Sequence, residues 1–133
     1  MTVVRTSVLV VDDDKALARA IGRSLEQAGH TVHLAHDGNQ ALRMLAAEPP
    51  DVVISDIMMP ERDGIELIGD IARQSPAMPI IAISSGGAFG LDVLDLAHKM
   101  GAQAVMRKPF RFEDLVDLVG SMIGRARSSA TAA

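Results

Sequence analysis

Short runs of branched apolar residues alternate along the chain with stretches in which apolar residues recur at helical spacing. Such alternation favours an α/β fold with parallel strands, right-handed crossovers and helices on both faces of the sheet. We therefore predict five strand–helix units, (βα)5, in one doubly wound five-stranded parallel sheet. The five expected strands are residues 7–11, 31–35, 52–54, 79–83 and 103–107.

Capping residues mark several of the expected helix boundaries. Asp14 precedes the first helical stretch and Gly29 follows it, which are the positions of an N-cap and of a C-terminal glycine. Asp37 and Gly38 are expected to form the turn into the second helix. Small and basic residues replace the apolar periodicity near the end, so we expect one domain at residues 1–124 and a disordered tail at 125–133.

Composition limits the class of protein and its compartment. The 133 residues include no Cys, which excludes disulfides and thiolate metal sites and fits a reducing compartment. The net charge of -4 disfavours a nucleic-acid-binding surface. No apolar run approaches the roughly 20 residues that a membrane span needs. We expect a cytoplasmic protein that does not contact nucleic acid or membrane directly.

Polar residues follow four of the apolar runs, at strand ends that a parallel sheet places on one edge. In chain order they are Asp12 and Asp13, Asp56, Ser84 with Ser85, and Lys108. Open α/β folds bind their ligands outside this edge. One such residue alone is an ordinary turn or capping residue. The whole set, in successive strand order, favours a shared site.

The chemistry of these residues indicates a phosphoryl site with a metal ion. Carboxylates that share a crevice repel one another unless a cation lies among them. Oxygen ligands without His or Cys favour a hard ion, Mg²⁺ or else Mn²⁺. The Ser84 hydroxyl and the Lys108 ammonium suit an anion such as a phosphoryl group. Asp56 is then the expected nucleophile, which would form an acyl phosphate.

The segments VLVVDDD, VVISDIMMPERDG, PIIAISS and RKPF resemble the receiver domain of two-component response regulators. The resemblance runs from about residue 8 to residue 123 and implies a flavodoxin-like fold with strand order 2-1-3-4-5. It implies that Asp56 accepts a phosphoryl group from a sensor histidine kinase or a histidine phosphotransfer protein. It also implies Mg²⁺ ligands at Asp13, Asp56 and the main-chain carbonyl of Met58, with Asp12 acting mainly through water.

The resemblance further implies that Ser84 hydrogen-bonds the phosphoryl oxygen, that Lys108 pairs with it, and that the Lys108-Pro109 bond is often cis. Two features depart from the family's pattern. Val105 stands where the family carries an aromatic switch residue, and a valine cannot make the same rotamer swing. Beyond Ser84 the chain reads SGGAFG, and its glycines lower the cost of unusual backbone angles. We expect activation to reorder this loop, including Ser85, Gly86 and Gly87, with little change at Val105.

The favoured function is a stand-alone receiver, monomeric or weakly dimeric, that catalyses only its own phosphorylation and dephosphorylation. It would signal to an unknown downstream protein by contact, or pass its phosphate on in a relay. Two alternatives stay open: a phosphohydrolase of the haloacid dehalogenase type with Asp12 as nucleophile, and a receiver-like interaction module that does not depend on phosphate. His30, His33 and His36 are not expected to share a metal, because residues three apart face opposite sides of a strand.

Overall fold

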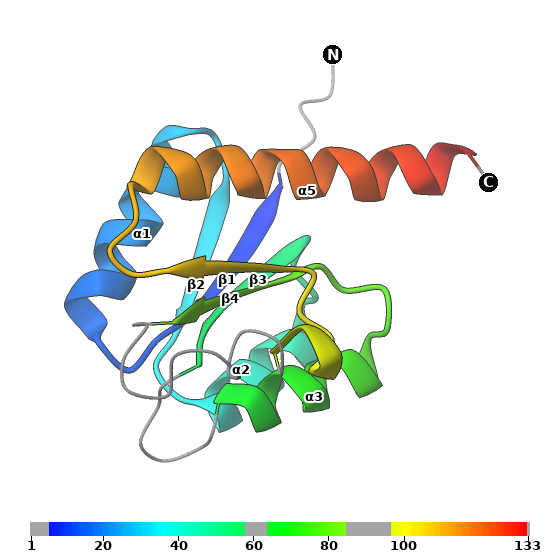
Figure 1. Ribbon diagram of the computed structural model, residues 1–133, viewed down its shortest axis with the longest axis horizontal. Coiled ribbons are helices and arrows are strands. Elements are labelled where there is room, and N and C mark those ends of the chain that lie inside the picture. The colour runs from blue at the N-terminus through cyan, green and yellow to red at the C-terminus, as the bar shows by residue number, and fades with distance from the viewer. Residues whose placement is uncertain (1–5, 58–63, 85–96, 133) are drawn as a thin grey trace.

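A computed structural model describes residues 6–57, 64–84 and 97–132 of the chain (Figure 1). Strands and helices alternate, as the sequence predicts, and residues 97–100 are also helical. The strands are β1 (Ser7–Val11), β2 (Thr31–Ala35), β3 (Val52–Asp56), β4 (Ile80–Ser84) and β5 (Ala104–Arg107). The helices with defined bounds are α1 (Lys15–Gln27), α2 (Gly38–Ala47), α3 (Gly64–Gln74) and α5 (Phe112–Ala132).

The five strands form one parallel sheet in the order β2-β1-β3-β4-β5, which confirms the expected flavodoxin-like topology. The register pairs Val11 with Ala35 and with Ser55, and Asp56 with Ile83. At the far edge Ser84 pairs with Arg107. The carboxyl ends of β1, β3, β4 and β5 therefore lie together at one edge of the sheet.

Two apolar layers cover the sheet, one on each face. Alternate residues of β1 divide between them: Leu9 and Val11 join the cluster that contains residues of α2 and α3, whereas Val8 and Val10 join the cluster that contains residues of α1 and α5. Figure 1 shows the same division, with α1 and α5 on one side of the sheet and α2 and α3 on the other. Burial of each large aliphatic side chain contributes about 1.5–3 kcal/mol, so these layers hold the strand ends in place.

The predicted caps are present at the helix ends. The Asp14 side chain accepts a hydrogen bond from the Leu17 N–H at 3.1 Å, and the Asp37 side chain accepts one from the Gln40 N–H at 2.7 Å. Gly29 follows α1 with a φ of 101°, a conformation that favours glycine. The sequence therefore located the Asp14 N-cap and the glycine after α1 correctly, whereas the capping role of Asp37, expected only as part of a turn, comes from the structure.

Helix α5 continues to Ala132, whereas the sequence indicated a disordered tail from residue 125. Alanine and arginine have high helix propensity, and no proline interrupts residues 125–132, so the helix can propagate without an apolar stripe.

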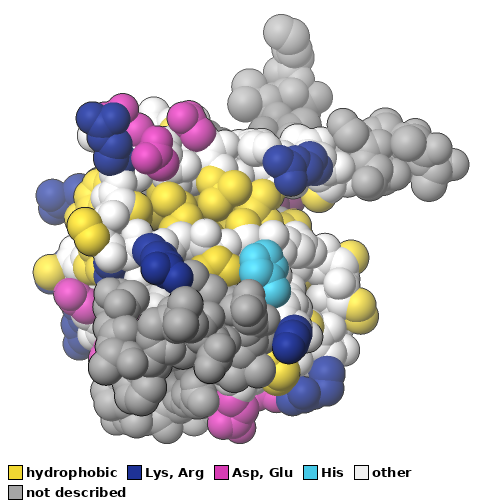
Figure 2. Space-filling model, viewed as in Figure 1, with side chains coloured by type: hydrophobic (Ala, Val, Ile, Leu, Met, Phe, Trp, Pro, Cys, Tyr) yellow, Lys and Arg dark blue, Asp and Glu magenta, His cyan; other side chains and the backbone are white. Residues whose placement is uncertain are grey.

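On the face in Figure 2, hydrophobic side chains gather in a band along α5. None of the helices within the described ranges is long and apolar enough to cross a membrane.

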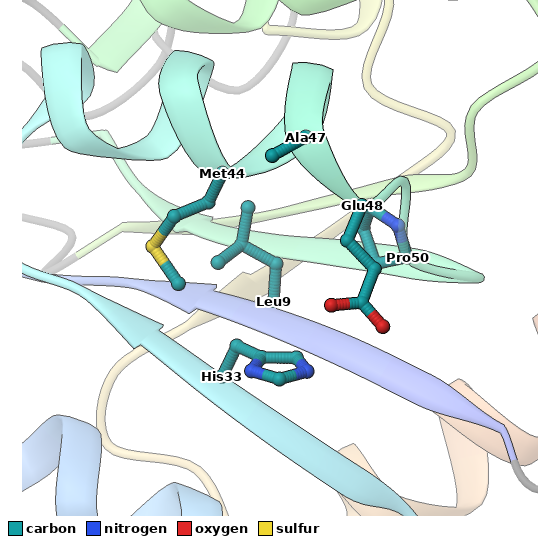
Figure 3. Close-up of a pocket in the computed structure, with 6 residues that line it drawn as sticks. All are labelled: Leu9, His33, Met44, Ala47, Glu48 and Pro50. Carbon is teal, nitrogen blue, oxygen red and sulfur yellow. The ribbon is translucent and has the colours of Figure 1, made fainter.

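A small, mainly apolar cavity of about 120 Å³ lies between the sheet and the end of α2. Figure 3 shows its lining, which comprises Leu9, His33, Met44, Ala47, Glu48 and Pro50. His33 borders this cavity, whereas the His30 ring contacts the Thr6 hydroxyl and the His36 ring faces the Asp12 carbonyl. The three histidines of this region thus have separate surroundings and do not form a metal-ligand set.

Candidate functional site

The strand ends bring together the acidic residues that the sequence singled out. Asp12 and Asp13 follow β1, and Asp56 is the last residue of β3. One carboxylate oxygen from each residue lies within 4.8 Å of the others. Asp12 and Asp56 are buried, with 1% and 5% of their surface exposed, whereas Asp13 is exposed. The cluster is therefore open to solvent on the side of Asp13.

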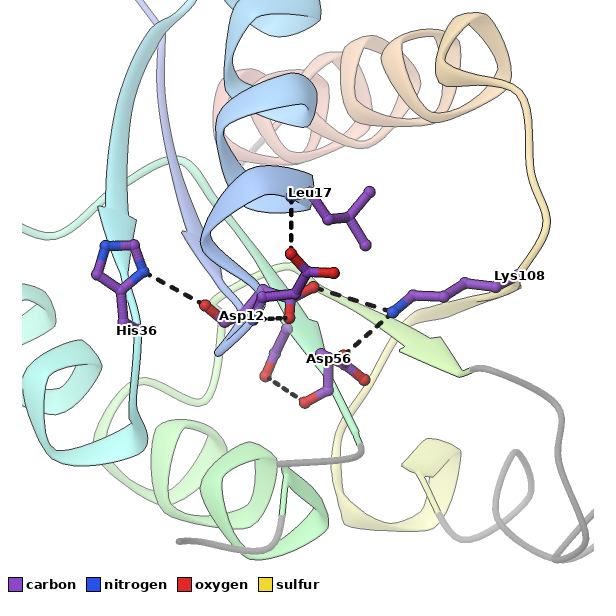
Figure 4. A network of polar contacts seen from close by, with 7 residues as sticks. Asp12, Leu17, His36, Asp56 and Lys108 are labelled. Atoms are coloured by element: carbon purple, nitrogen blue, oxygen red, sulfur yellow. Dashed lines mark hydrogen bonds and ion pairs between the residues drawn. The ribbon is translucent and has the colours of Figure 1, made fainter. Parts of the chain in front are cut away.

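Lys108 lies against this cluster from the end of β5 (Figure 4). Its Nζ is 3.2 Å from Asp56 Oδ2 and 4.0 Å from Asp12 Oδ2. Its backbone N–H donates to the Ser84 carbonyl at 2.7 Å, which ties the lysine to the end of β4. The Lys108-Pro109 bond is cis, as the resemblance implied. One cation thus faces two buried carboxylates.

The two oxygens of Asp12 have unequal surroundings. Oδ1 accepts a hydrogen bond from the Asp14 N–H at 2.9 Å, whereas buried Oδ2 has no hydrogen-bond partner among the described residues. Burial raises the pKa of the Asp12 carboxyl from 3.8 to about 6; the hydrogen bond from Asp14 opposes this rise and the charge of Asp56 adds to it. Ionisation of Asp12 is therefore less favourable in the folded protein than in water.

These features fit a hard divalent cation. Three carboxylates supply oxygen ligands only, the donor set that Mg²⁺ prefers, and the described residues give buried Asp12 Oδ2 no hydrogen-bond donor. A cation beside that oxygen would favour the charged form that burial disfavours. Asp12, Asp13 and Asp56 are the described residues that could hold it. The carbonyl of Met58, the other expected ligand, lies outside the described residues.

The expected switch residues are described only in part. Ser84 is the last residue of β4 and is buried, with 6% of its surface exposed. Val105 is half-buried in β5, pairs with Ala82, and packs against the apolar cluster on the α2 and α3 side. Ser85, Gly86 and Gly87 lie outside the described residues.

His36 is a neighbour of the site that the sequence analysis did not connect with it. Its Nδ1 lies 3.4 Å from the carbonyl oxygen of Asp12 (Figure 4). His36 directly follows β2. It lies beside Asp12 only because β2 pairs with β1 and because the register sets Ala35 opposite Val11. The sequence signal is the DG turn at residues 37–38, which ends β2 level with the acidic pair.

Comparison with known proteins identifies the class that this fold and site define. The response regulator receiver domain family matches residues 8–120, so the chain belongs to this family. It is 36% identical over 120 residues to the response regulator MprA of Mycobacterium ulcerans (strain Agy99) and 35% identical to MprA of Mycobacterium tuberculosis (strain ATCC 25618 / H37Rv). These alignments cover 90% of this chain and 51% of each relative, so the chain spans about half the length of the curated relatives it matches.

Solved receiver domains have the same architecture. The Francisella response regulator 1452 receiver domain superposes with a TM-score of 0.83 at 31% identity, covering 91% of this chain and 98% of that one. A CheY-like receiver domain protein from Methanospirillum hungatei JF-1 gives 0.89 at 25% identity, with 95% and 99% covered. The chain is accordingly a phosphorylation-controlled signalling module, and nothing in these matches favours a phosphohydrolase with Asp12 as nucleophile.

Proposed function

We propose that Asp56 is the phosphoacceptor of this receiver and that Asp12, Asp13 and Lys108 assist the transfer. The observation that carries the proposal is the position of the Asp56 carboxylate. It ends the central strand β3, lies within 4.8 Å of both other carboxylates, and has the Lys108 ammonium 3.2 Å from Oδ2.

The donor is a phosphohistidine on a sensor histidine kinase or a histidine phosphotransfer protein. A carboxylate oxygen of Asp56 attacks the phosphorus, a P–O bond forms, and the P–N bond breaks as the imidazole leaves. Lys108 is placed to pair with a phosphoryl oxygen, since it already contacts the carboxylate that would carry it. The chain would catalyse only its own phosphorylation and dephosphorylation.

The acidic residues would hold Mg²⁺, or Mn²⁺ in its place, together with the main-chain carbonyl of Met58. When bound, the cation neutralises charge on the phosphoryl oxygens. Asp13 and Asp56 would be the direct ligands, and Asp12 would act mainly through water. Asp12 Oδ2, which has no hydrogen-bond partner in the described parts of the chain, is the oxygen available for that water.

The response to phosphate passes through Ser84 and the loop that follows it. Ser84 hydrogen-bonds the phosphoryl oxygen, and Ser85, Gly86 and Gly87 rearrange in consequence. Val105 takes little part, because it is a small side chain already packed against a core cluster. A downstream protein then reads the changed surface, or the phosphate passes on in a relay. We place these events in the cytoplasm and infer a monomer or weak dimer, with no direct binding of nucleic acid or membrane by this part.

Phosphorylation by acetyl phosphate tests the proposal. Intact-mass measurement of the wild-type protein should show the gain of one phosphoryl group with Mg²⁺ and none with a chelator. Asp56→Asn should abolish the gain. Asp14→Asn is the matched control: it removes an exposed acid next to the site but keeps a good N-cap, so phosphorylation should persist. Full phosphorylation of Asp56→Asn would contradict the assignment.

A further inference from the structure

Within the described residues, the hydrogen bonds between β1 and β2 reach the Asp12 N–H and stop one step short of the Asp12 carbonyl. The Thr31 N–H donates to the Thr6 carbonyl at 2.8 Å, and the Asp12 N–H donates to the Ala35 carbonyl at 3.0 Å. In a parallel pair the same strand donates at every second residue. The series of bonds that starts from the Thr31 N–H to the Thr6 carbonyl would therefore continue, at every second residue, to a bond from the Asp37 N–H to the Asp12 carbonyl.

The chain turns away from the sheet before that bond can form. Asp37 is the N-cap of α2, and its side chain accepts from the Gln40 N–H. In the described part of the chain, the ring of His36 faces the Asp12 carbonyl instead, with Nδ1 3.4 Å from the oxygen. A carbonyl oxygen can only accept, so Nδ1 must carry the hydrogen of this long hydrogen bond.

His36 is itself held in place by the start of α2. Its backbone N–H donates to Gln40 Oε1 at 2.8 Å, and the Gln40 N–H donates to Asp37 Oδ1 at 2.7 Å. The ring is half-buried. The cap of α2 therefore fixes the backbone from which the imidazole reaches Asp12.

The contacted oxygen belongs to the peptide that joins Asp12 to Asp13. Asp13 lies beyond the end of β1, in a bend, and its side chain is exposed, so strand pairing does not orient it. A donor at the Asp12 carbonyl fixes the plane of this peptide and thereby the direction of the Asp13 carboxylate. A misdirected ligand weakens metal binding even when every ligand is present.

We propose that His36 is a positioning residue: its Nδ1–H holds the Asp12 carbonyl and so orients the acidic pair for divalent-cation binding. This inference rests on the proposed function of the site. It assigns the imidazole no contact with the cation or the phosphoryl group. The hydrogen bond, rather than the aromatic ring, is the required feature, so an amide that donates from the same position should replace the imidazole.

Mg²⁺ titration by calorimetry at constant pH, on wild type and variants, tests the inference. His36→Phe keeps a ring but removes the donor, and it should weaken Mg²⁺ binding about three- to fivefold. His36→Asn places an amide N–H where Nδ1 was and should restore binding to within about twofold. His33→Phe makes the same change within β2, beside the cavity of Figure 3, and should leave binding unchanged. His36→Ala replaces His36→Phe if the larger ring prevents folding.

The outcomes separate the two levels of inference. Wild-type affinity in a folded His36→Phe or His36→Ala protein would overturn the positioning role while the proposed function stands. Binding in His36→Asn as weak as in His36→Phe would overturn the role of the hydrogen bond. A wild-type protein that neither binds Mg²⁺ nor accepts phosphate would contradict the proposed function and, with it, this inference.

Discussion

Replacing Asp12 with asparagine should stabilise the metal-free protein at neutral pH. Asp12 is almost fully buried, its Oδ2 has no hydrogen-bond donor among the described residues, and Asp56 lies close by. An amide of nearly the same shape keeps the acceptor for the Asp14 N–H and removes the buried charge. The gain in free energy of unfolding measures how much the ionised Asp12 carboxylate destabilises the metal-free protein.

The magnitude follows from the pKa of Asp12, which burial raises from 3.8 to about 6. Because the folded protein holds this proton more tightly than the unfolded chain, its stability falls as the pH rises from about 4 to about 6. Above that window both states are ionised and the full effect is present, at most about 3 kcal/mol. Below the window both are protonated and the effect is absent. Asp12→Asn should therefore gain about 1–3 kcal/mol at pH 7.5 and little near pH 4.

Urea unfolding with a chelator present, followed by far-ultraviolet circular dichroism, measures this difference; the chain has no Trp or Tyr for fluorescence. Asp14→Asn is the control, since Asp14 is exposed and asparagine also caps a helix, and it should change stability little at either pH. Added Mg²⁺ should stabilise the wild type more than Asp12→Asn. If Asp12→Asn is no more stable than wild type at pH 7.5, or if its gain is the same at both pH values, the argument from burial is wrong.

Three other predictions follow from the site and the turns. Lys108→Ala should fold and accept phosphate from acetyl phosphate, but its amide exchange should respond less to beryllofluoride than that of the wild type, because the group that contacts Asp56 is lost; a wild-type response would remove Lys108 from the switch. Amide exchange of the wild type should slow at residues 85–94 on adding beryllofluoride, and an unchanged loop with altered exchange confined to residues 103–107 would refute the loop switch. Gly101→Ala should lower the free energy of unfolding by about 2–4 kcal/mol, because φ is 131° and a new Cβ would lie 2.7 Å from the Ala72 Cβ. Gly29→Ala, where φ is 101° but the space is open, should lose only about 1–2 kcal/mol, and equal losses would show that the contact with Ala72 is unimportant.

The strand ends explain why the central part of the site could be predicted from sequence. A parallel sheet places the ends of all its strands on one edge, so Asp12, Asp56 and Lys108 converge whatever the details of side-chain packing. The N-cap at Asp14 and the turn into α2 at Asp37 depend only on local sequence, and both were located correctly. Features set by strand order or by short-range rules can be read from one sequence.

Contacts that depend on side-chain reach could not be predicted in this way. The approach of His36 to Asp12 requires the register of β2 on β1 and the direction of the turn before α2. The raised pKa of Asp12 depends on burial, which an acid after a strand need not have. The length of α5 was underestimated because helix propensity in residues 125–132 outweighs the missing apolar stripe. The boundary at residue 124 stays a prediction.

The division of the interior by the sheet has a consequence for how such a protein can diversify. The side chains of Leu9 and Val11 belong to one apolar cluster and those of Val8 and Val10 to the other. Substitutions in separate clusters share few neighbours, and the energies of such distant changes are nearly additive. Mutations can therefore change the surface of α2 and α3 to suit a new partner while the surface of α1 and α5 stays the same. The carboxylates stay in place throughout, because the strands that carry them are anchored from both sides.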